Sequence, residues 1–126
     1  MNGTVIQSIS QIGIPVKDIQ RASRFYQGTL ELPLLFQTET MAFFQLAGQT
    51  LMLTLPEKDE FDHPSSVLYF QVADIQQGYQ YYLKKGVSFK GKPHFVAKVG
   101  EAETWMAFFE DTEGNTHALK AEVPAT

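Results

Sequence analysis

The stretch IGIPVKDIQRASRFY at residues 12–26 returns in altered form as LYFQVADIQQGYQYY at residues 68–82. Both stretches contain V-x-D-I-Q, which begins at Val16 in the first and at Val72 in the second. A further pair is MAFF, at residues 41–44 and again at 106–109. Because the repeated pieces keep the same order, we interpret the chain as two copies of one structural unit.

Each copy has the pattern of a strand, a helix and three further strands. Apolar residues alternate along 12–16 and 68–72, as in a half-buried strand. Asp18 and Asp74 then stand where a carboxylate caps a helix. The later strands are expected at 34–38, 41–46 and 50–55, and at 87–97, 103–110 and 116–122. These elements predict an α+β protein made of two tandem βαβββ modules.

The repeat also predicts how the chain is divided. The expected units are a single domain over 1–126, with module one at about 4–55, a linker at 56–66 and module two at about 67–122. The linker, PEKDEFDHPSS, is rich in acidic side chains and is typical of a solvated connector. Metal ligation is the less favoured interpretation of its polar residues, which include Asp59, Glu60, Asp62 and His63.

The composition limits the partners of the chain. A net charge of −4 and a pI near 5.3 argue against binding to nucleic acid or to an anionic membrane. The absence of cysteine excludes disulfides, a thiolate nucleophile and thiolate metal sites. The N-terminal residues MNGTVIQSIS lack the features of a signal peptide, and the apolar runs are shorter than a membrane span. We therefore expect a cytoplasmic protein without a membrane partner.

Three motifs resemble the vicinal-oxygen-chelate superfamily, which contains glyoxalase I, bleomycin-resistance proteins and extradiol dioxygenases. They are IGIPVKDIQRASRFYQGTLEL (12–32), FQVADIQQGYQYYLKKGVSF (70–89) and WMAFFEDTEGNTHAL (105–119). The resemblance implies that the sheets of the two modules curve around a cleft. It also implies a divalent metal there, held by the first and last strand of each module. Glu31 stands where the family usually has Gly, so we expect a mildly strained left-handed backbone there.

The four metal-ligand positions implied by the resemblance are Gln11, Met52, Val67 and Ala118. The spacing of the internal repeat selects the same four positions. Only Gln11 offers an oxygen, and a thioether such as that of Met52 is poorly matched to hard cations. We therefore expect the fold of the family without a metal cofactor at its usual positions.

The remaining polar and aromatic positions favour a small-molecule site, and sequestration as in bleomycin-resistance proteins is the function that the resemblance implies. The predicted ligand-binding residues are Gln11, Met52, Tyr69, Gln71, His94, Trp105 and Phe108. Strand alternation turns His117 away from the cleft if Ala118 faces it, so His117 is expected to be a buried structural histidine. The pattern does not decide which residues of each MAFF face the cleft.

The alternative is a metal-dependent lyase or dioxygenase-like enzyme with relocated ligands, drawn from Gln11, His94, Glu103 and His117. The sequence identifies no catalytic residue for such a reaction. Members of the family with one two-module chain often pair, and the partner completes the edges of the cleft. The resemblance therefore also predicts a homodimer.

Overall fold

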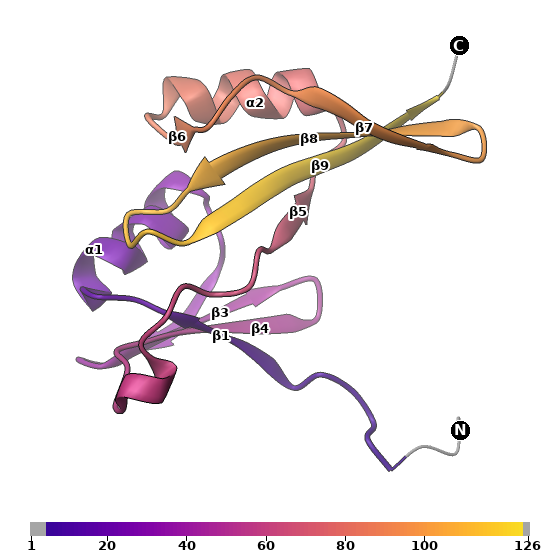
Figure 1. Cartoon of the computed structure of the whole chain (residues 1–126). Helices are drawn as coiled ribbons and strands as arrows, with labels where there is room; N and C mark the ends of the chain where they lie inside the picture. The colour runs from indigo at the N-terminus through magenta and orange to yellow at the C-terminus, as the bar shows by residue number, and fades with distance from the viewer. Residues whose placement is uncertain (1–4, 125–126) are drawn as a thin grey trace.

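The computed structural model describes residues 5–124 of the chain (Figure 1). Module one contains β1 (Gln11–Pro15), α1 (Ile19–Ser23), the π-helical turn η1 (Arg24–Thr29), β2 (Leu34–Gln37), β3 (Met41–Leu46) and β4 (Gln49–Thr54). The linker contains the short 3₁₀ helix η2 (Asp59–Phe61). Module two contains β5 (Tyr69–Gln71), α2 (Ile75–Lys84), β6 (Ser88–Phe89), β7 (His94–Val99), β8 (Ala102–Glu110) and β9 (Thr116–Pro124). The predicted α+β class and the tandem modules are confirmed.

The strands form two mixed sheets, one from each module. Module one has the strand order β1-β4-β3-β2, and module two has β5-β9-β8-β6 with β7 also paired to β8. In each sheet the first strand is parallel to the last, with Gln11 opposite Thr50 and Tyr69 opposite Ala118. The other pairs are antiparallel. The two halves of the sequence repeat therefore have the same topology.

Both helices begin at the predicted caps. The Asp18 carboxylate accepts a hydrogen bond from the Arg21 backbone N–H at 3.0 Å, and Asp74 accepts one from the Gln77 N–H at 2.9 Å. Such caps satisfy N–H groups that have no partner inside the helix. The expected left-handed conformation of Glu31 is also present, with φ 64°. A side chain in this region costs about 1 kcal/mol.

One predicted strand is wrong in its extent. The sequence pattern favours a continuous strand over 87–97, but the structure has two short strands there, β6 and β7. Gly91 and Pro93 lie in the gap between them, and proline has no backbone N–H to donate to a neighbouring strand. The last hydrogen bond before the gap runs from the Lys90 N–H to the Phe108 carbonyl at 2.8 Å.

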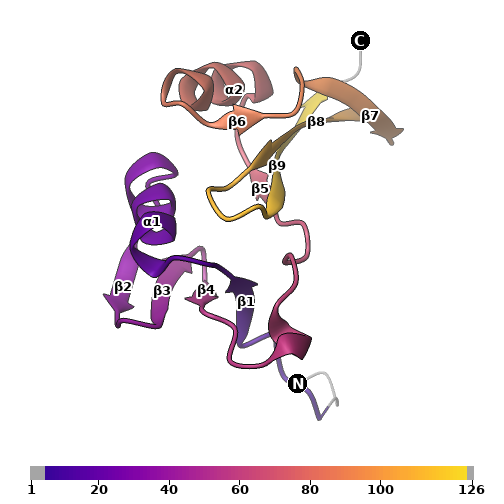
Figure 2. The ribbon, with the colours of Figure 1, turned by 60° about the vertical axis from the view of Figure 1, so that its left-hand side comes forward.

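A single hydrophobic core joins the two modules. Helix α1 and η1 cover the inner face of the module one sheet and also face β9 (Figure 2). The Tyr26 ring lies 6.1 Å from Phe44 of module one and 6.2 Å from His117 of module two, centroid to centroid. Because the inner faces of both sheets pack on this core, their outer faces point away from it.

The two MAFF segments contribute apolar side chains to both faces of their sheets. In β3, Ala42 and Phe44 are buried in the core, whereas Met41 and Phe43 lie half-buried on the outer face. The segment in β8 repeats this arrangement at Met106, Ala107, Phe108 and Phe109. Strand alternation therefore decides which MAFF residues face outward.

A buried polar network links η1 to the β8–β9 turn. The Tyr26 hydroxyl donates to Asp111 at 2.6 Å and lies 2.9 Å from His117 Nε2. The Leu68 backbone N–H donates to His117 Nδ1 at 3.2 Å, so the ring proton must be on Nε2, which donates to Tyr26. The ring is thus neutral, and burial lowers the pKa of His117 despite the nearby Asp111 carboxylate. The predicted structural role of His117 is confirmed.

Candidate functional site

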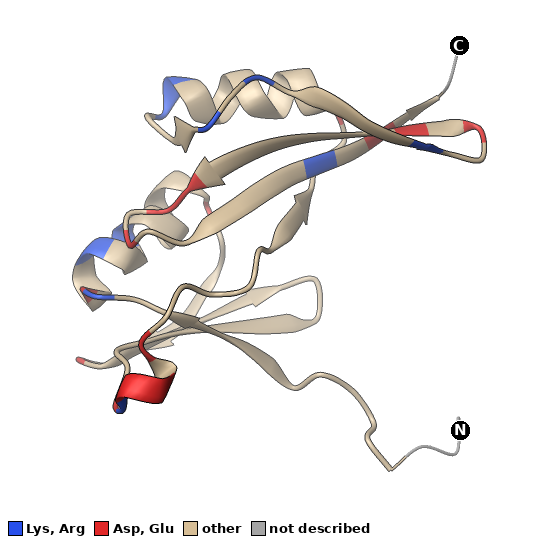
Figure 3. Cartoon of the chain, in the orientation of Figure 1, with Lys and Arg blue, Asp and Glu red and all other residues tan. Residues whose placement is uncertain are grey.

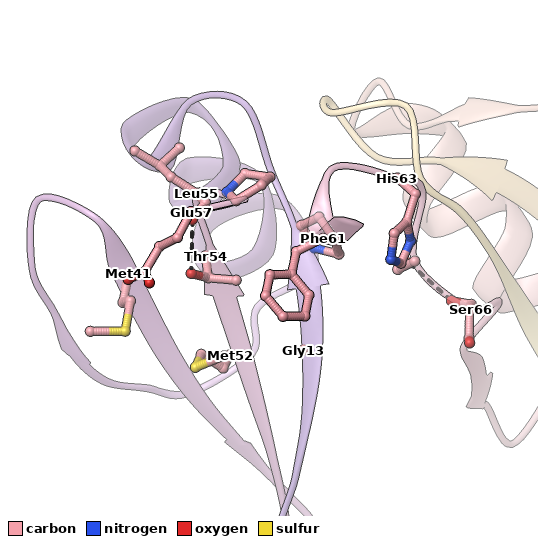
Figure 4. A pocket seen from close by; sticks show the side chains of 12 residues that line it. Gly13, Met41, Met52, Thr54, Leu55, Glu57, Phe61, His63 and Ser66 are labelled. Carbon is pink, nitrogen blue, oxygen red and sulfur yellow. Dashed lines mark hydrogen bonds between the residues drawn. The ribbon is translucent and has the colours of Figure 1, made fainter. Parts of the chain in front are cut away.

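The outer face of module one contains a cavity of about 440 Å³, here called the outer-face cavity (Figure 4). The sheet residues that line it are Gly13, Pro15, Met41, Met52 and Thr54, and the linker residues are Leu55, Pro56, Glu57, Phe61, His63, Ser65 and Ser66. The floor is therefore formed by β1, β3 and β4, and the linker forms a wall.

The linker reaches this face because it continues from the end of β4, which lies beside the edge strand β1, and must then lead to β5. Its end is anchored by the Ser65 N–H, which donates to the Asn115 side chain at 2.9 Å. The Asn115 amide in turn donates to the Pro15 carbonyl at 2.9 Å. These bonds hold the segment that carries Phe61 and His63 close to β1. Phe61 and His63 thus line the cavity, although both side chains remain exposed to solvent.

The chemistry of the outer-face cavity is mainly apolar. The thioethers of Met41 and Met52 adapt to different ligand shapes, and the Phe61 ring can stack on a flat ligand. Gly13 contributes no side chain to the floor, where a Cβ atom would lie 3.8 Å from the Met52 methyl group. The acidic residues of the linker lie at and around η2 (Figure 3), whose residue Phe61 lines the cavity. The site thus suits a neutral or cationic molecule better than an anion.

The outer face of module two carries a separate aromatic group. The Tyr69 and Phe108 rings meet edge to face at a centroid distance of 6.3 Å. The His94 ring stacks on Phe108 with a centroid distance of 5.8 Å and an interplanar angle of 21°. Gln71 donates to the Glu122 carboxylate at 3.0 Å beside them. An aromatic molecule could add to this stack from the solvent side.

The structure therefore brings the predicted residues together in two groups. Gln11 Nε2 lies 3.5 Å from Met52 Sδ on module one. Tyr69, Gln71, His94 and Phe108 lie on module two, and within one chain the two outer faces do not meet. Met106 and Phe108 lie on the outer face of β8, so Trp105, one residue before Met106, lies on the opposite face. Its ring contacts that of Phe95 at a centroid distance of 6.2 Å.

Sequence reasoning missed Phe61 and His63 as residues that line the outer-face cavity. The sequence offers one signal. Phe61 and His63 are the two aromatic side chains of a linker that is rich in charged residues. A single exposed apolar ring is common on protein surfaces, so this signal alone does not locate a cavity.

The side chains at the family's metal positions do not fit a hard divalent cation. They comprise the amide of Gln11, the thioether of Met52 and the hydrocarbon side chains of Val67 and Ala118. Across residues 5–124, no three His, Cys, Asp or Glu side chains are grouped so that they could hold a metal ion.

The relocated ligands of the alternative interpretation do not meet within the chain either. His117 is fully buried in the core, and both of its ring nitrogens have hydrogen-bonding partners. The Glu103 carboxylate accepts a hydrogen bond from the Trp105 ring at 3.2 Å. His94 lies on the outer face of module two, and Gln11 belongs to module one.

The comparison with protein families gives the same assignment as the fold. The family model of the Glyoxalase/Bleomycin resistance protein/Dioxygenase superfamily matches residues 8–119. The chain belongs to this superfamily. A search of curated proteins found no match. Among the residues that the structure describes, no helix is long and apolar enough to cross a membrane.

Several solved structures share the fold of this chain at low sequence identity. A superfamily member from Sphaerobacter thermophilus DSM 20745 is 21% identical with a TM-score of 0.77, covering 94% of this chain and 99% of that chain. Lactoylglutathione lyase from Agrobacterium tumefaciens is 15% identical with a TM-score of 0.70, covering 92% and 94%. TnmS3, an antibiotic binding protein from Streptomyces sp. CB03234, is 20% identical with a TM-score of 0.75, covering 95% and 99%.

Proposed function

We propose that this superfamily member is a small-molecule-binding protein that uses no metal at the family's usual positions. The observation that carries the proposal is the outer-face cavity, whose floor contains Met52, at one of the family's metal-ligand positions, together with Met41. Its volume of about 440 Å³ falls in the range of pockets that enclose drug-sized ligands. The ligand is an apolar or aromatic molecule, held by burial and ring stacking.

Sequestration requires only that the ligand be bound and withdrawn from solution. Shape, stacking and a few polar anchors are sufficient for this, and no group needs to donate or accept a proton at a reacting atom. The similarity to TnmS3, described as an antibiotic binding protein, is consistent with such a role. The residues that would contact the ligand are Met52 and Gln11 in module one and Phe61 in the linker. Tyr69 and Phe108 would contribute from module two.

We further propose that a second copy of the chain completes the site. The outer faces expose large apolar rings, including Phe36 and Tyr69, to solvent. Within one chain the two groups of predicted residues lie apart, whereas a homodimer can place module one of one copy opposite module two of the other. Covering these rings would also remove apolar surface from water.

The test is a ligand titration on matched phenylalanine variants. A panel of planar aromatic compounds is screened by thermal stabilisation, and the affinity of a hit is then measured by calorimetry. Phe61→Ala should weaken binding about tenfold, which corresponds to about 1.4 kcal/mol of lost contact. Phe95→Ala is the control, because Phe61 and Phe95 are similarly exposed, at 52% and 49%, and Phe95 lies away from the cavity.

The proposal fails if no compound stabilises the protein, because a ligand that prefers the native state must raise its stability. It also fails for this cavity if the two variants lose affinity equally. In that case the binding site lies elsewhere on the chain.

A further inference from the structure

A second cavity of about 570 Å³ lies between the two modules, here called the intermodule cavity. Its lining residues from module one are Leu30, Glu31, Leu32, Leu46, Ala47 and Gln49. Those from module two are Tyr69, Phe70, Gln71, Val72, Tyr82, Phe109 and Leu119. None of these residues lines the outer-face cavity. In Figure 1 the β3–β4 turn, which forms one rim, lies below β5.

The intermodule cavity reaches the hydrophobic core. Phe109 and Leu119 are only 1% and 2% exposed, yet both line it. Phe70 and Leu32 extend the apolar wall toward the opening. Water inside such a space would find few hydrogen-bonding partners, so an apolar molecule can replace it favourably.

The polar groups at the rim already have partners. Tyr81 donates to the Glu31 carboxylate at 2.6 Å, and Lys85 lies 3.5 Å from it. The Tyr81 hydrogen bond, followed by the Lys85 charge, lowers the pKa of Glu31, although partial burial opposes this. The Tyr82 hydroxyl donates to the Leu30 carbonyl at 3.3 Å. Among the described residues, none that lines this cavity carries an unpaired positive or negative charge. This favours a neutral ligand.

Backbone strain is concentrated at the same rim. Among residues 5–124, the two residues other than glycine with positive φ are Glu31 at 64° and Ala47 at 48°. Both line the intermodule cavity, one from each side of its module one wall. Strained conformations persist where the surrounding structure holds them, and they are enriched at ligand sites.

Helix α2 fixes one end of the cavity through contacts with module one. Besides the bonds of Tyr81 and Tyr82, the Lys85 ammonium donates to the Gly28 carbonyl at 3.1 Å. These hydrogen bonds hold the two modules at a fixed spacing. They lie at one end of the cavity and leave its interior open. Apolar pockets between structural units are common places for ligands to bind.

From these observations we infer that the intermodule cavity is a second binding site, which takes a neutral and mainly apolar small molecule. The volume admits a drug-sized ligand, and the buried floor supplies the apolar contact. The two cavities share no lining residue, although Tyr69 lines the intermodule cavity and also belongs to the proposed ligand contacts of module two. A ligand here would contact both modules at once and would stabilise their packing.

The test uses the neutral fluorophore N-phenyl-1-naphthylamine and protein with labelled Leu and Met methyl groups. Methyl NMR separates the sites, because Leu32 and Leu119 report the intermodule cavity whereas Met41 and Met52 report the outer-face cavity. We expect saturable shifts of the Leu32 and Leu119 methyls, with contacts between the probe and the Leu119 methyls in the wild-type protein. Shifts confined to Met methyls, or no shifts, would overturn the inference.

Two tryptophan substitutions on one strand provide the matched control. Leu46→Trp should fill the cavity and reduce the probe affinity at this site at least tenfold. Gln45→Trp adds the same ring to the neighbouring residue on the other face of β3, and it should leave the affinity unchanged. Equal effects would contradict the inference. If Leu46→Trp does not fold, the wild-type contacts with Leu119 decide the matter.

A second copy of the chain is the competing occupant. In that case the Leu32 and Leu119 methyl signals would shift with protein concentration in the absence of the probe, and the probe would not add to the shift. Such a result would also overturn the inference of a small-molecule site.

Discussion

Replacing Glu113 by glutamine would test the buried ion pair that joins the modules. The Glu113 side chain is fully buried, and its Oε2 lies 2.7 Å from Arg21 Nε. Its Oε1 accepts hydrogen bonds from the Lys17 and Asp18 backbone N–H groups at 2.8 and 3.0 Å. The Thr112 hydroxyl also donates to Oε2, at 2.8 Å. A glutamine amide nitrogen cannot accept a hydrogen bond, so Glu113→Gln loses the ion pair and places one donor against another.

The magnitude follows from the pKa of Glu113. Burial alone would raise this pKa, but the hydrogen bonds from Arg21, Thr112 and the backbone outweigh burial and lower it from 4.5 to about 2. At about 1.36 kcal/mol per pKa unit, the ionised carboxylate contributes about 3 kcal/mol to the free energy of unfolding. Because the folded-state pKa is lowered, this stability is present above pH 4.5 and is lost as the pH falls toward 2.

The assay is urea unfolding between pH 7 and pH 3 at one protein concentration, followed by circular dichroism. At pH 7, the free energy of unfolding of Glu113→Gln should be about 3 kcal/mol lower than that of the wild type. This difference should shrink as the pH falls below 4.5. Glu110→Gln is the control, because Glu110 is exposed and pairs with Lys90 at 3.3 Å. This exposed pair contributes at most about 1 kcal/mol. A difference for Glu113→Gln that stays constant with pH would refute the reasoning.

Three further outcomes are expected. Tyr26→Phe removes the hydroxyl between Asp111 and His117 and should lower the free energy of unfolding by about 1–3 kcal/mol, as measured by urea titration. An unchanged urea midpoint would show that the network contributes nothing to stability. Light scattering should give twice the chain mass of 14.2 kDa, and a monomer at micromolar concentration would exclude the proposed homodimer. Protein purified without chelator should carry substoichiometric Zn, Ni, Mn and Fe by elemental analysis; stoichiometric metal that is lost in Gln11→Ala would favour the enzyme alternative.

Much of the fold could be predicted because it depends on short stretches of chain. The alternation along β1 and β5 specifies which side of each strand enters the core, and that choice needs no distant residue. The caps at Asp18 and Asp74 act within three residues, so their positions are readable directly. The break between β6 and β7 could have been predicted, because residues 90–94 are Lys, Gly, Lys, Pro and His, without alternating apolar side chains, and Pro93 lacks a backbone N–H.

The site was predicted only in part, for a reason of geometry. Strand alternation predicts that Gln11 shares a sheet face with Met52, and Tyr69 with Phe108. Gln11 and Met52 lie on the neighbouring strands β1 and β4, whereas β9 separates Tyr69 on β5 from Phe108 on β8. Trp105 could not be assigned to a face until the register of β8 with β9 was known. The position of Phe61 depends on the path of the linker, for which no periodic pattern exists.

The sequence alone therefore determined the repeated βαβββ unit, the helix caps and the lack of an oxygen or imidazole ligand at three of the four metal positions. Each of these properties is local in the chain or belongs to a single side chain. Only the tertiary structure decided that η1 packs Tyr26 against His117, that the linker forms a wall of the outer-face cavity, and that a second cavity lies between the modules. These features arise from contacts between residues up to 100 positions apart, and a local pattern cannot encode contacts of that range.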